Sequence, residues 1–202
     1  MSEIVFDAEK HTYRRDGVFL DSVTRVIKAV WPVKPDYSAA DPVVLENARL
    51  RGIETETLFY AYLRGEMTEY PEGTREDACE LCDKLINWWE SRPECFHGDV
   101  ETQVIVGDAE IAGTLDLLIG GFVWDLKCTS GIEPTYLIQV AAYSELGGFG
   151  IGGIIQINKG LKAPKFISPT TVQQKSDLDD WLAIRKVWSA AKRRAPKGIE
   201  NA

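Results

Sequence analysis

The sequence predicts an α/β (α+β) protein in which helices flank a mixed sheet that contains an antiparallel meander. Apolar residues recur at helical spacing in much of the first half, the spacing changes to alternation from Val100, and helices and strands then follow in turn. A length of 202 residues suits one compact domain. We therefore expect a single domain over residues 1–202, with a helical N-terminal part (1–95), a central sheet and helix (96–175) and a basic C-terminal helix (176–202).

A short hairpin and two helices are expected before the sheet. The hairpin lies around residues 13–20. Asp41 is a good N-cap and is followed by a proline at the first helical position, so a helix is expected over about residues 42–63. A second helix covers about residues 74–91 and stops before a proline.

The meander and the elements after it follow from turn dipeptides and caps. Gly107-Asp108 and Gly120-Gly121 suit two-residue hairpin turns between three strands. Pro134 starts a helix that ends at Gly147-Gly148. Ser176 opens the last helix with a capping box. The expected strands lie at residues 100–106, 110–119, 122–128, 151–158 and 163–172.

The formal net charge of −8 argues against a protein that coats nucleic acid by charge alone, but the charge is unevenly placed. Residues 10–35 hold six bases and two acids, and residues 185–198 hold six bases and no acid. Residues 66–101 hold eleven acids and three bases. Two basic ends therefore flank an acidic middle, which is either an anion-binding arrangement or a solvated charged surface.

The sequence has no signal-peptide core and no stretch that approaches 18 consecutive apolar residues. We therefore expect a cytoplasmic (intracellular) protein with no membrane partner. Four cysteines in such a chain suggest reduced thiols. Cys79, Cys82, Cys95 and His97 could be drawn as a zinc site, but Cys79 and Cys82 also fit one helix, so zinc is not expected.

The middle hairpin is the most informative part of the sequence. With Gly120-Gly121 as its turn, Asp116 stands opposite Asp125, with Cβ atoms about 4.5–5.5 Å apart, and Lys127 lies on the same face. Two facing carboxylates need a cation, which Lys127 supplies in part and a divalent metal such as Mg²⁺ would complete. The other face is apolar and expected to be packed: Leu115, Leu117, Ile119, Phe122, Trp124 and Leu126.

Two further carboxylates are candidates for the same site. With Gly107-Asp108 as a two-residue turn, Glu101 falls opposite Thr114 on the face of Asp116, whereas a three-residue turn would reverse that placement. Glu56 fills a gap in the apolar stripe of the helix over residues 42–63. It is either a buried ligand or a partly exposed residue at the edge of the stripe.

Gln139 and Tyr143 are four residues apart on one face of the helix that begins at Pro134. Both side chains end in hydrogen-bonding groups. The pair therefore suits contact with a phosphate or orientation of a site lysine, with a polar helix edge as the alternative.

Gly113-Thr-Leu-Asp116, Trp124-Asp125-Leu-Lys127 and Gln139-x-x-x-Tyr143, in this order, resemble the PD-(D/E)XK nuclease superfamily. More narrowly, they are similar to its RecB-like and lambda-type exonuclease branch. The segment from Arg51 to Glu56 resembles the upstream helix motif of that branch, and residues 11–27 resemble the start of phage-encoded and mitochondrial-exonuclease-like members. The resemblance implies a restriction-endonuclease-like core and covers about residues 11–145.

The resemblance also implies a role for each matching residue. Asp116 and Asp125 would bind Mg²⁺ (or Mn²⁺), with Glu56 and the Leu126 carbonyl completing the shell, and Lys127 would orient or deprotonate the attacking water. Glu101 would be an auxiliary group, and Gln139 and Tyr143 would support Lys127 or hold DNA. No iron–sulfur cluster is implied, because no cysteine follows Cys128. The candidates for contact with DNA are Arg14, Arg15, Ser22, Thr24, Arg25 and Arg51.

The sequence thus favours a metal-dependent DNA nuclease, in the finer form an exonuclease of phage-type recombination, replication or repair in a bacterial host. Its partner would be DNA, together with a single-strand-annealing or single-strand-binding protein. A non-catalytic acidic module or DNA mimic built on residues 66–101 is the alternative. A retaining glycosidase, which also uses two close carboxyls, is disfavoured because Lys127 lies beside the pair and the aromatic residues face away from it.

Overall fold

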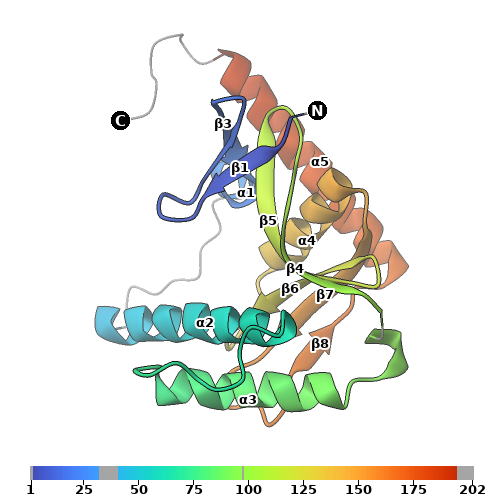
Figure 1. Cartoon of the computed structure of the whole chain (residues 1–202). Helices are drawn as coiled ribbons and strands as arrows, with labels where there is room; N and C mark the ends of the chain where they lie inside the picture. The colour runs from blue at the N-terminus through green and yellow to red at the C-terminus, as the bar shows by residue number, and fades with distance from the viewer. Residues whose placement is uncertain (1, 32–40, 97, 195–202) are drawn as a thin grey trace.

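The computed structural model describes residues 2–31, 41–96 and 98–194 (Figure 1). Within them, eight strands form one mixed sheet and five α-helices flank it, which confirms the α/β (α+β) class and is consistent with a restriction-endonuclease-like core. The strands are β1 (Ile4–Asp7), β2 (Thr12–Arg15), β3 (Val18–Ser22), β4 (Val100–Gly107), β5 (Ile111–Ile119), β6 (Phe122–Lys127), β7 (Gly150–Gln156) and β8 (Lys165–Ile167). The helices are α1 (Val23–Val30), α2 (Pro42–Leu63), α3 (Glu76–Glu90), α4 (Pro134–Gly147) and α5 (Thr171–Arg194), with a short 3₁₀ helix at Glu94–Phe96.

β5 is the strand on which the sheet is organised. It pairs antiparallel with β4 and β6 and parallel with β3, and β6 in turn pairs parallel with β7. The β5–β6 ladder has the predicted register, with Leu117 opposite Trp124. Its two-residue turn is Gly120-Gly121, with φ of 56° and 82°, values that favour glycine.

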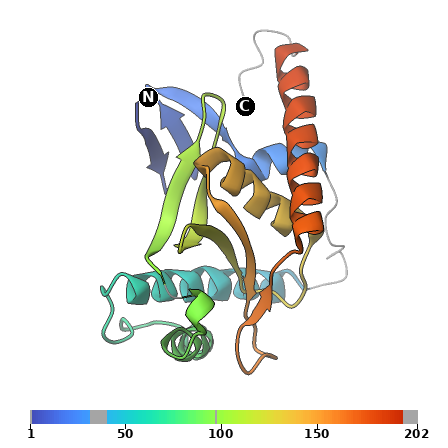
Figure 2. The same cartoon turned by 90° about the vertical axis from the view of Figure 1, so that its right-hand side faces the viewer.

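The helices cover the two faces of the sheet (Figures 1 and 2). α1, α4 and α5 pack on one face around a buried cluster that includes Val26, Ile138 and Trp181. α2 and α3 pack on the other face around a second cluster that includes Phe59 and Leu81. Within the described ranges, none of the helices combines the length and the apolar character needed to cross a bilayer.

Most helix ends lie where local chemistry predicts them. The Asp41 carboxylate accepts a hydrogen bond of 2.8 Å from the Val43 N–H, so α2 begins at the expected proline. α4 ends at Gly148, whose φ of 70° is the left-handed conformation of a glycine C-cap. α3 begins and ends within two residues of the expected limits.

The expected start of the last helix is wrong, and the N-terminal sheet is larger than expected. α5 begins at Thr171 rather than Ser176, because the Thr170 carbonyl and hydroxyl accept the N–H groups of Gln174 and Gln173. The hairpin over residues 13–20 is present as β2 and β3. A further strand, β1, pairs with β2, although its four residues were too few to show an alternating pattern.

The apolar face expected for the β5–β6 hairpin is only partly correct. Phe122 is 52% exposed, because it lies at the end of the hairpin against Gly150 rather than in the core. Leu117 packs against α2 and α3, as do Ile119, Trp124 and Leu126. Leu115 instead packs in the cluster on the opposite face, so β5 changes face between these two leucines.

Candidate active site

The candidate site lies where β5 and β6 separate. Their ladder ends at Leu117 and Trp124, and the same register places Asp116 opposite Asp125 beyond it. No ladder pair forms there, because the Asp116 Oδ2 atom accepts the Leu126 N–H at 2.8 Å. β6 continues along β7, while β5 continues toward β3, so the two aspartates lie at the mouth of a gap between β3 and β6.

The ladder on the other edge of β5 is interrupted at the same position. The pairs Thr102–Leu117 and Val104–Leu115 flank Gln103, which is not paired although it lies across from Asp116. Gln103 has φ of 54°, which is uncommon for a residue other than glycine. Asp116 therefore lies at an irregular point of β5, the same point at which the strand changes face.

Asp125 and Lys127 form a buried ion pair on β6. Asp125 is 1% exposed, and its Oδ2 atom lies 2.6 Å from the Lys127 Nζ atom. The Asp125 Oδ1 atom is buried without a hydrogen-bond partner. Burial raises the pKa of Asp125 to about 7, the positive charge of Lys127 opposes this shift, and the negative charge of Asp116 adds to it.

Lys127 is a cation in this arrangement. Burial lowers its pKa, but the negative charges of Asp125 and Asp116 outweigh burial, so the pKa lies above its ordinary value. The ammonium group also lies 5.2 Å from the centre of the Tyr136 ring. Lys127 therefore neutralises part of the negative charge of the two aspartates.

α2 lies across this gap and is held at two places. A Cβ atom added at Gly52 would lie 3.4 Å from the Cys128 Cβ, so the absence of a side chain lets the helix approach the end of β6. Twelve residues later, the Arg64 guanidinium donates to the Thr102 Oγ1 and Gln103 Oε1 atoms, both at 3.1 Å. The face of α2 between these two places lies over Asp116.

Glu56 lies on this face of α2 and is half-buried. Burial, followed by the negative charge of Asp116, raises the pKa of Glu56 to about 8. Glu56 therefore lies within electrostatic reach of the aspartates, and its intermediate exposure fits a position at the inner edge of the α2 stripe.

Gln139 and Tyr143 lie against the opposite face of β5. The Gln139 amide donates a 2.9 Å hydrogen bond to the Tyr143 hydroxyl, and Tyr143 is 4% exposed. The Tyr143 ring lies on Gly113, where an added Cβ would come within 2.5 Å of the ring. Gly113 is therefore needed because α4 approaches the β5 backbone closely there.

Two tyrosines that the sequence did not single out lie beside the carboxylates. The Tyr13 hydroxyl lies 2.9 Å from the Thr114 Oγ1 atom and so connects β2 to β5. Tyr60 is 4% exposed, and its hydroxyl is buried without a hydrogen-bond partner. The only sequence signal for Tyr60 is its position four residues after Glu56 on a helix.

The expected position of Glu101 is wrong. Glu101 is exposed and pairs with Leu118, while Ile105 takes the place opposite Thr114. The turn lies two residues further along the chain than expected, because the Asp108 N–H donates to the Ile111 carbonyl at 2.9 Å and the Asp108 carboxylate accepts the N–H groups of Glu110 and Ile111 at 2.8 and 2.9 Å. This displacement of the turn moves the register of β4 by four residues.

The candidates for contact with DNA on β3 and α1 already have partners. The Ser22 hydroxyl caps α1 by accepting the Arg25 N–H at 3.2 Å, and it lies 3.3 Å from the Thr24 hydroxyl. The Arg25 guanidinium forms an ion pair of 3.3 Å with Asp21. These contacts fix the start of α1, while the Arg25 side chain remains 62% exposed.

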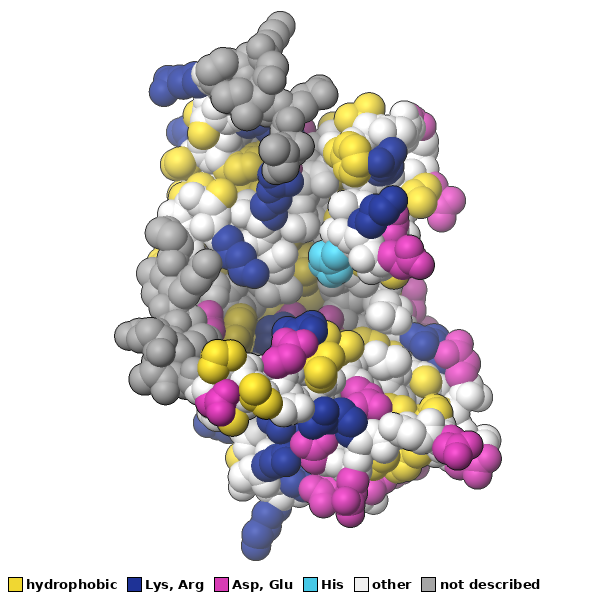
Figure 3. All heavy atoms as spheres, turned by 90° about the vertical axis from the view of Figure 1, so that its left-hand side faces the viewer, with side chains coloured by type: hydrophobic (Ala, Val, Ile, Leu, Met, Phe, Trp, Pro, Cys, Tyr) yellow, Lys and Arg dark blue, Asp and Glu magenta, His cyan; other side chains and the backbone are white. Residues whose placement is uncertain are grey.

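The other arginines proposed to contact DNA lie on different elements and have different partners. Arg14 is exposed, with its guanidinium 3.8 Å from the centre of the Phe19 ring. Arg51 pairs with Asp77 at 3.4 Å. Figure 3 shows that the surface is hollowed between the part that holds β1–β3 and the part that holds α2 and α3, with Lys and Arg side chains beside the hollow.

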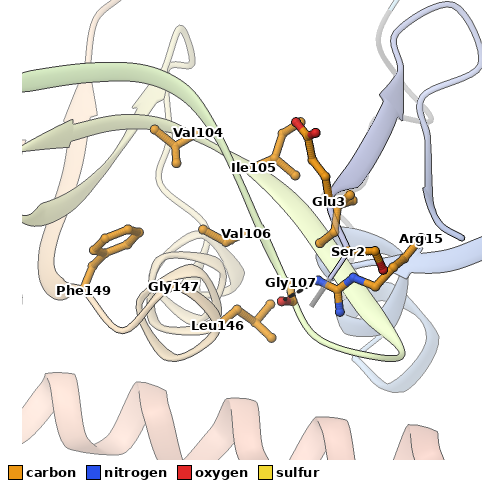
Figure 4. Close-up of a pocket in the computed structure, with 11 residues that line it drawn as sticks. Ser2, Glu3, Arg15, Val104, Ile105, Val106, Gly107, Leu146, Gly147 and Phe149 are labelled. Carbon is orange, nitrogen blue, oxygen red and sulfur yellow. Dashed lines mark hydrogen bonds between the residues drawn. The ribbon is translucent and has the colours of Figure 1, made fainter.

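Arg15 belongs to a separate pocket of about 420 Å³ at the outer edge of β4 (Figure 4). Its guanidinium donates to the carbonyls of Asp108 and Gly107 at 2.7 and 3.4 Å, which ties β2 to the β4–β5 loop. The walls are both apolar, as at Val104 and Phe149, and polar, as at Glu3, and neither Asp116 nor Asp125 lines this pocket.

The carboxylate and carbonyl oxygens of the candidate site are the type of ligand that Mg²⁺ prefers. The Lys127 carbonyl accepts the Ile157 N–H, so the neighbouring Leu126 carbonyl points the other way, toward the gap near Asp116. Among the residues that the structure describes, no three His, Cys, Asp or Glu side chains are close enough together to hold a metal ion. However, Mg²⁺ usually takes one or two protein carboxylates and keeps several waters, and Asp116 and Asp125 with its unpartnered Oδ1 meet that need.

Two of the cysteines lie on α3, whereas Cys128 follows Lys127 and lies against Gly52 of α2 at the candidate site. Cys82 is fully buried on α3, and Cys79 is half-buried on the same helix. The Cys95 side chain and His97 lie outside the described part of the structure, so the expectation of no zinc remains a prediction.

No family model matches the chain, and a search of the curated proteins finds no match. Among solved structures, the chain is similar to LHK-Exo, crystallised in complex with dAMP, with 14% identity over 88% of this chain and 94% of that chain and a TM-score of 0.40. It is also similar to SSO0001, with 15% identity over 68% of this chain and 88% of that chain and a TM-score of 0.30. Because both TM-scores are low, we draw the function from the residues of the candidate site.

Proposed function

We propose that the chain is a metal-dependent DNA nuclease that hydrolyses phosphodiester bonds. The observation that carries the proposal is the buried Asp125–Lys127 ion pair beside Asp116, at the point where β5 and β6 separate. Asp125 is buried and Asp116 and Lys127 are half-buried. Placing these charges together away from water costs stability, and such an arrangement is typical of a site for chemistry rather than of a structural core.

Each residue of the site has a role in this proposal. Asp116 and Asp125 would hold Mg²⁺ (or Mn²⁺) together with the Leu126 carbonyl, and Glu56 would complete the shell through a bound water rather than as a direct ligand beside both aspartates. The bound ion would lower the pKa of a water molecule and stabilise negative charge on the phosphate. Lys127 would orient or deprotonate the attacking water, and its positive charge would add to the stabilisation of the phosphate.

Gln139 and Tyr143 would support the site from the α4 side. Their mutual hydrogen bond fixes the orientation of the Tyr143 ring, which packs against Gly113 in the strand that carries Asp116. DNA would approach through the hollow shown in Figure 3, which has Lys and Arg side chains beside it. The exposed side chains of Arg14 and Arg25 would contact phosphates.

The finer proposal is an exonuclease that acts in phage-type DNA recombination, replication or repair. It rests on the order of the sequence motifs and includes an intracellular location in a bacterial host. A single-strand-annealing or single-strand-binding protein is the proposed protein partner.

The test is cleavage of end-labelled DNA with Mg²⁺ or with EDTA. Wild-type protein should cleave only with the metal, and Lys127→Ala and Asp125→Asn should each lower the rate by about 100-fold or more. Lys165→Ala, at an exposed lysine of β8, is the matched control and should cleave like the wild type. Absence of cleavage by the wild type, or undiminished cleavage by Lys127→Ala, would contradict the proposal and favour a non-catalytic acidic module.

A further inference from the structure

Tyr60 lies on the face of α2 that covers the aspartates. Glu56 and Tyr60 are one turn apart, between the close approach at Gly52 and the Arg64 hydrogen bonds to β4. Tyr60 packs in the same buried cluster as Leu117 and Leu126, on the α2 side of the sheet. Because α2 is fixed at Cys128 at one end and at Gln103, across from Asp116, at the other, the stretch that carries Tyr60 lies over the part of the sheet between β6 and Asp116.

The Tyr60 hydroxyl is unusual because it is buried and unpartnered. A buried tyrosine hydroxyl normally has a hydrogen-bond partner, since its burial alone costs stability. Tyr62, two residues later on α2, follows the normal pattern and donates to the Glu90 carboxylate. Phenylalanine would fill the space of the Tyr60 ring equally well without this cost.

Negative charge surrounds the hydroxyl. Burial raises the pKa of Tyr60 well above its ordinary value, and the charges of Asp116, Glu56 and Asp125 raise it further, in that order. The group is therefore a neutral hydrogen-bond donor next to carboxylates. Of the Asp116 oxygens, Oδ2 already accepts the Leu126 N–H.

We propose that Tyr60 is a positioning residue of the site, whose hydroxyl donates a hydrogen bond to the Asp116 carboxylate when the site is loaded. This inference rests on the proposed function, since it needs a divalent cation at Asp116. In the free protein the hydroxyl has no partner, and a small shift of the carboxylate on loading would supply one. Groups that orient a metal-binding carboxylate in this way typically change metal affinity by about 10–100-fold.

The experiment measures the affinity for Mn²⁺ and the melting temperature of the intact protein, without DNA. Tyr60→Phe should weaken Mn²⁺ binding by about 10-fold in isothermal titration. Its melting temperature in EDTA should be equal to or higher than that of the wild type, because the variant lacks the unpartnered hydroxyl. Tyr62→Phe is the matched control and should leave Mn²⁺ binding unchanged while it loses the hydrogen bond to Glu90.

The outcomes distinguish the two proposals. If the wild type binds Mn²⁺ and Tyr60→Phe binds it equally well, the positioning role is overturned and the nuclease proposal stands. A lower melting temperature in EDTA with unchanged Mn²⁺ affinity would show that Tyr60 is structural only. If the wild type neither binds Mn²⁺ nor cleaves DNA, the proposed function fails, and the role of Tyr60 fails with it.

Discussion

At the scale of single residues, burial is the main influence on the carboxylates of the site. Together with neighbouring charges, of which Asp116 raises and Lys127 lowers each value, burial raises the pKa of Glu56 to about 8 and that of Asp125 to about 7. Lys127 compensates only one of the nearby carboxylates. The protein without metal is therefore stabilised when the site takes up a proton.

This effect predicts how the stability of the metal-free protein depends on pH. The ordinary pKa of Glu56 is 4.5, so the folded state holds this proton more tightly than the unfolded state does. The resulting stabilisation is complete below about pH 4 and is lost as the pH rises through about 8. Glutamine does not ionise, so Glu56→Gln keeps this stabilisation at high pH. The variant should therefore be more stable than the wild type at pH 9 by about 1 kcal/mol.

Urea denaturation in EDTA at pH 4 and pH 9 measures this difference. At pH 4 the two proteins should have similar free energies of unfolding, because Glu56 is then protonated in the wild type. Glu69→Gln, at an exposed residue of the loop after α2, should follow the wild type at both pH values. A variant Glu56→Gln that is less stable than the wild type at pH 9 would contradict the burial argued for Glu56.

At the scale of elements, sequence reasoning succeeded where one local feature fixed the geometry. Gly120-Gly121 can form a tight turn, and the apolar residues beside it can be buried in only one register of the two strands. The aspartates that face each other could therefore be predicted. Gly107-Asp108 suggested a turn that the structure places two residues later, where the Asp108 side chain holds it through contacts that the sequence does not show. Likewise, the sequence did not single out Tyr60, because the missing partner of its hydroxyl is visible only in three dimensions.

The contact between α4 and β5 gives a prediction at this scale. Gly113→Ala would place a methyl group 2.5 Å from the Tyr143 ring, which packing and the Gln139 hydrogen bond hold in place. The variant should lose about 1–3 kcal/mol of stability, because either α4 or β5 must move. Thermal unfolding measures the loss. Gly131→Ala, where an added Cβ meets nothing within 4 Å, is the control and should unfold like the wild type.

At the scale of the whole molecule, the net charge of −8 is distributed so that it does not exclude DNA. Several acids are paired within the fold: Asp77 contacts Arg51 and Lys159, and Asp21 contacts Lys192. The acids of the site are different, because Lys127 alone cannot neutralise them. In the proposed nuclease, the acids of the site without metal would therefore repel the phosphate that the Lys and Arg side chains beside the hollow attract.

This arrangement predicts how DNA affinity responds when a single charge is removed. In EDTA, where no cleavage occurs, Asp116→Asn should bind labelled DNA several-fold more tightly than the wild type, because one negative charge is removed beside the phosphate. Glu101→Gln removes the same charge from an exposed position opposite Leu118 and should bind like the wild type. Fluorescence anisotropy at low and physiological salt measures both affinities, and the advantage of Asp116→Asn should shrink as salt screens the charges. Equal binding by Asp116→Asn and the wild type would mean that DNA does not approach the aspartates, and would place its binding surface elsewhere on the molecule.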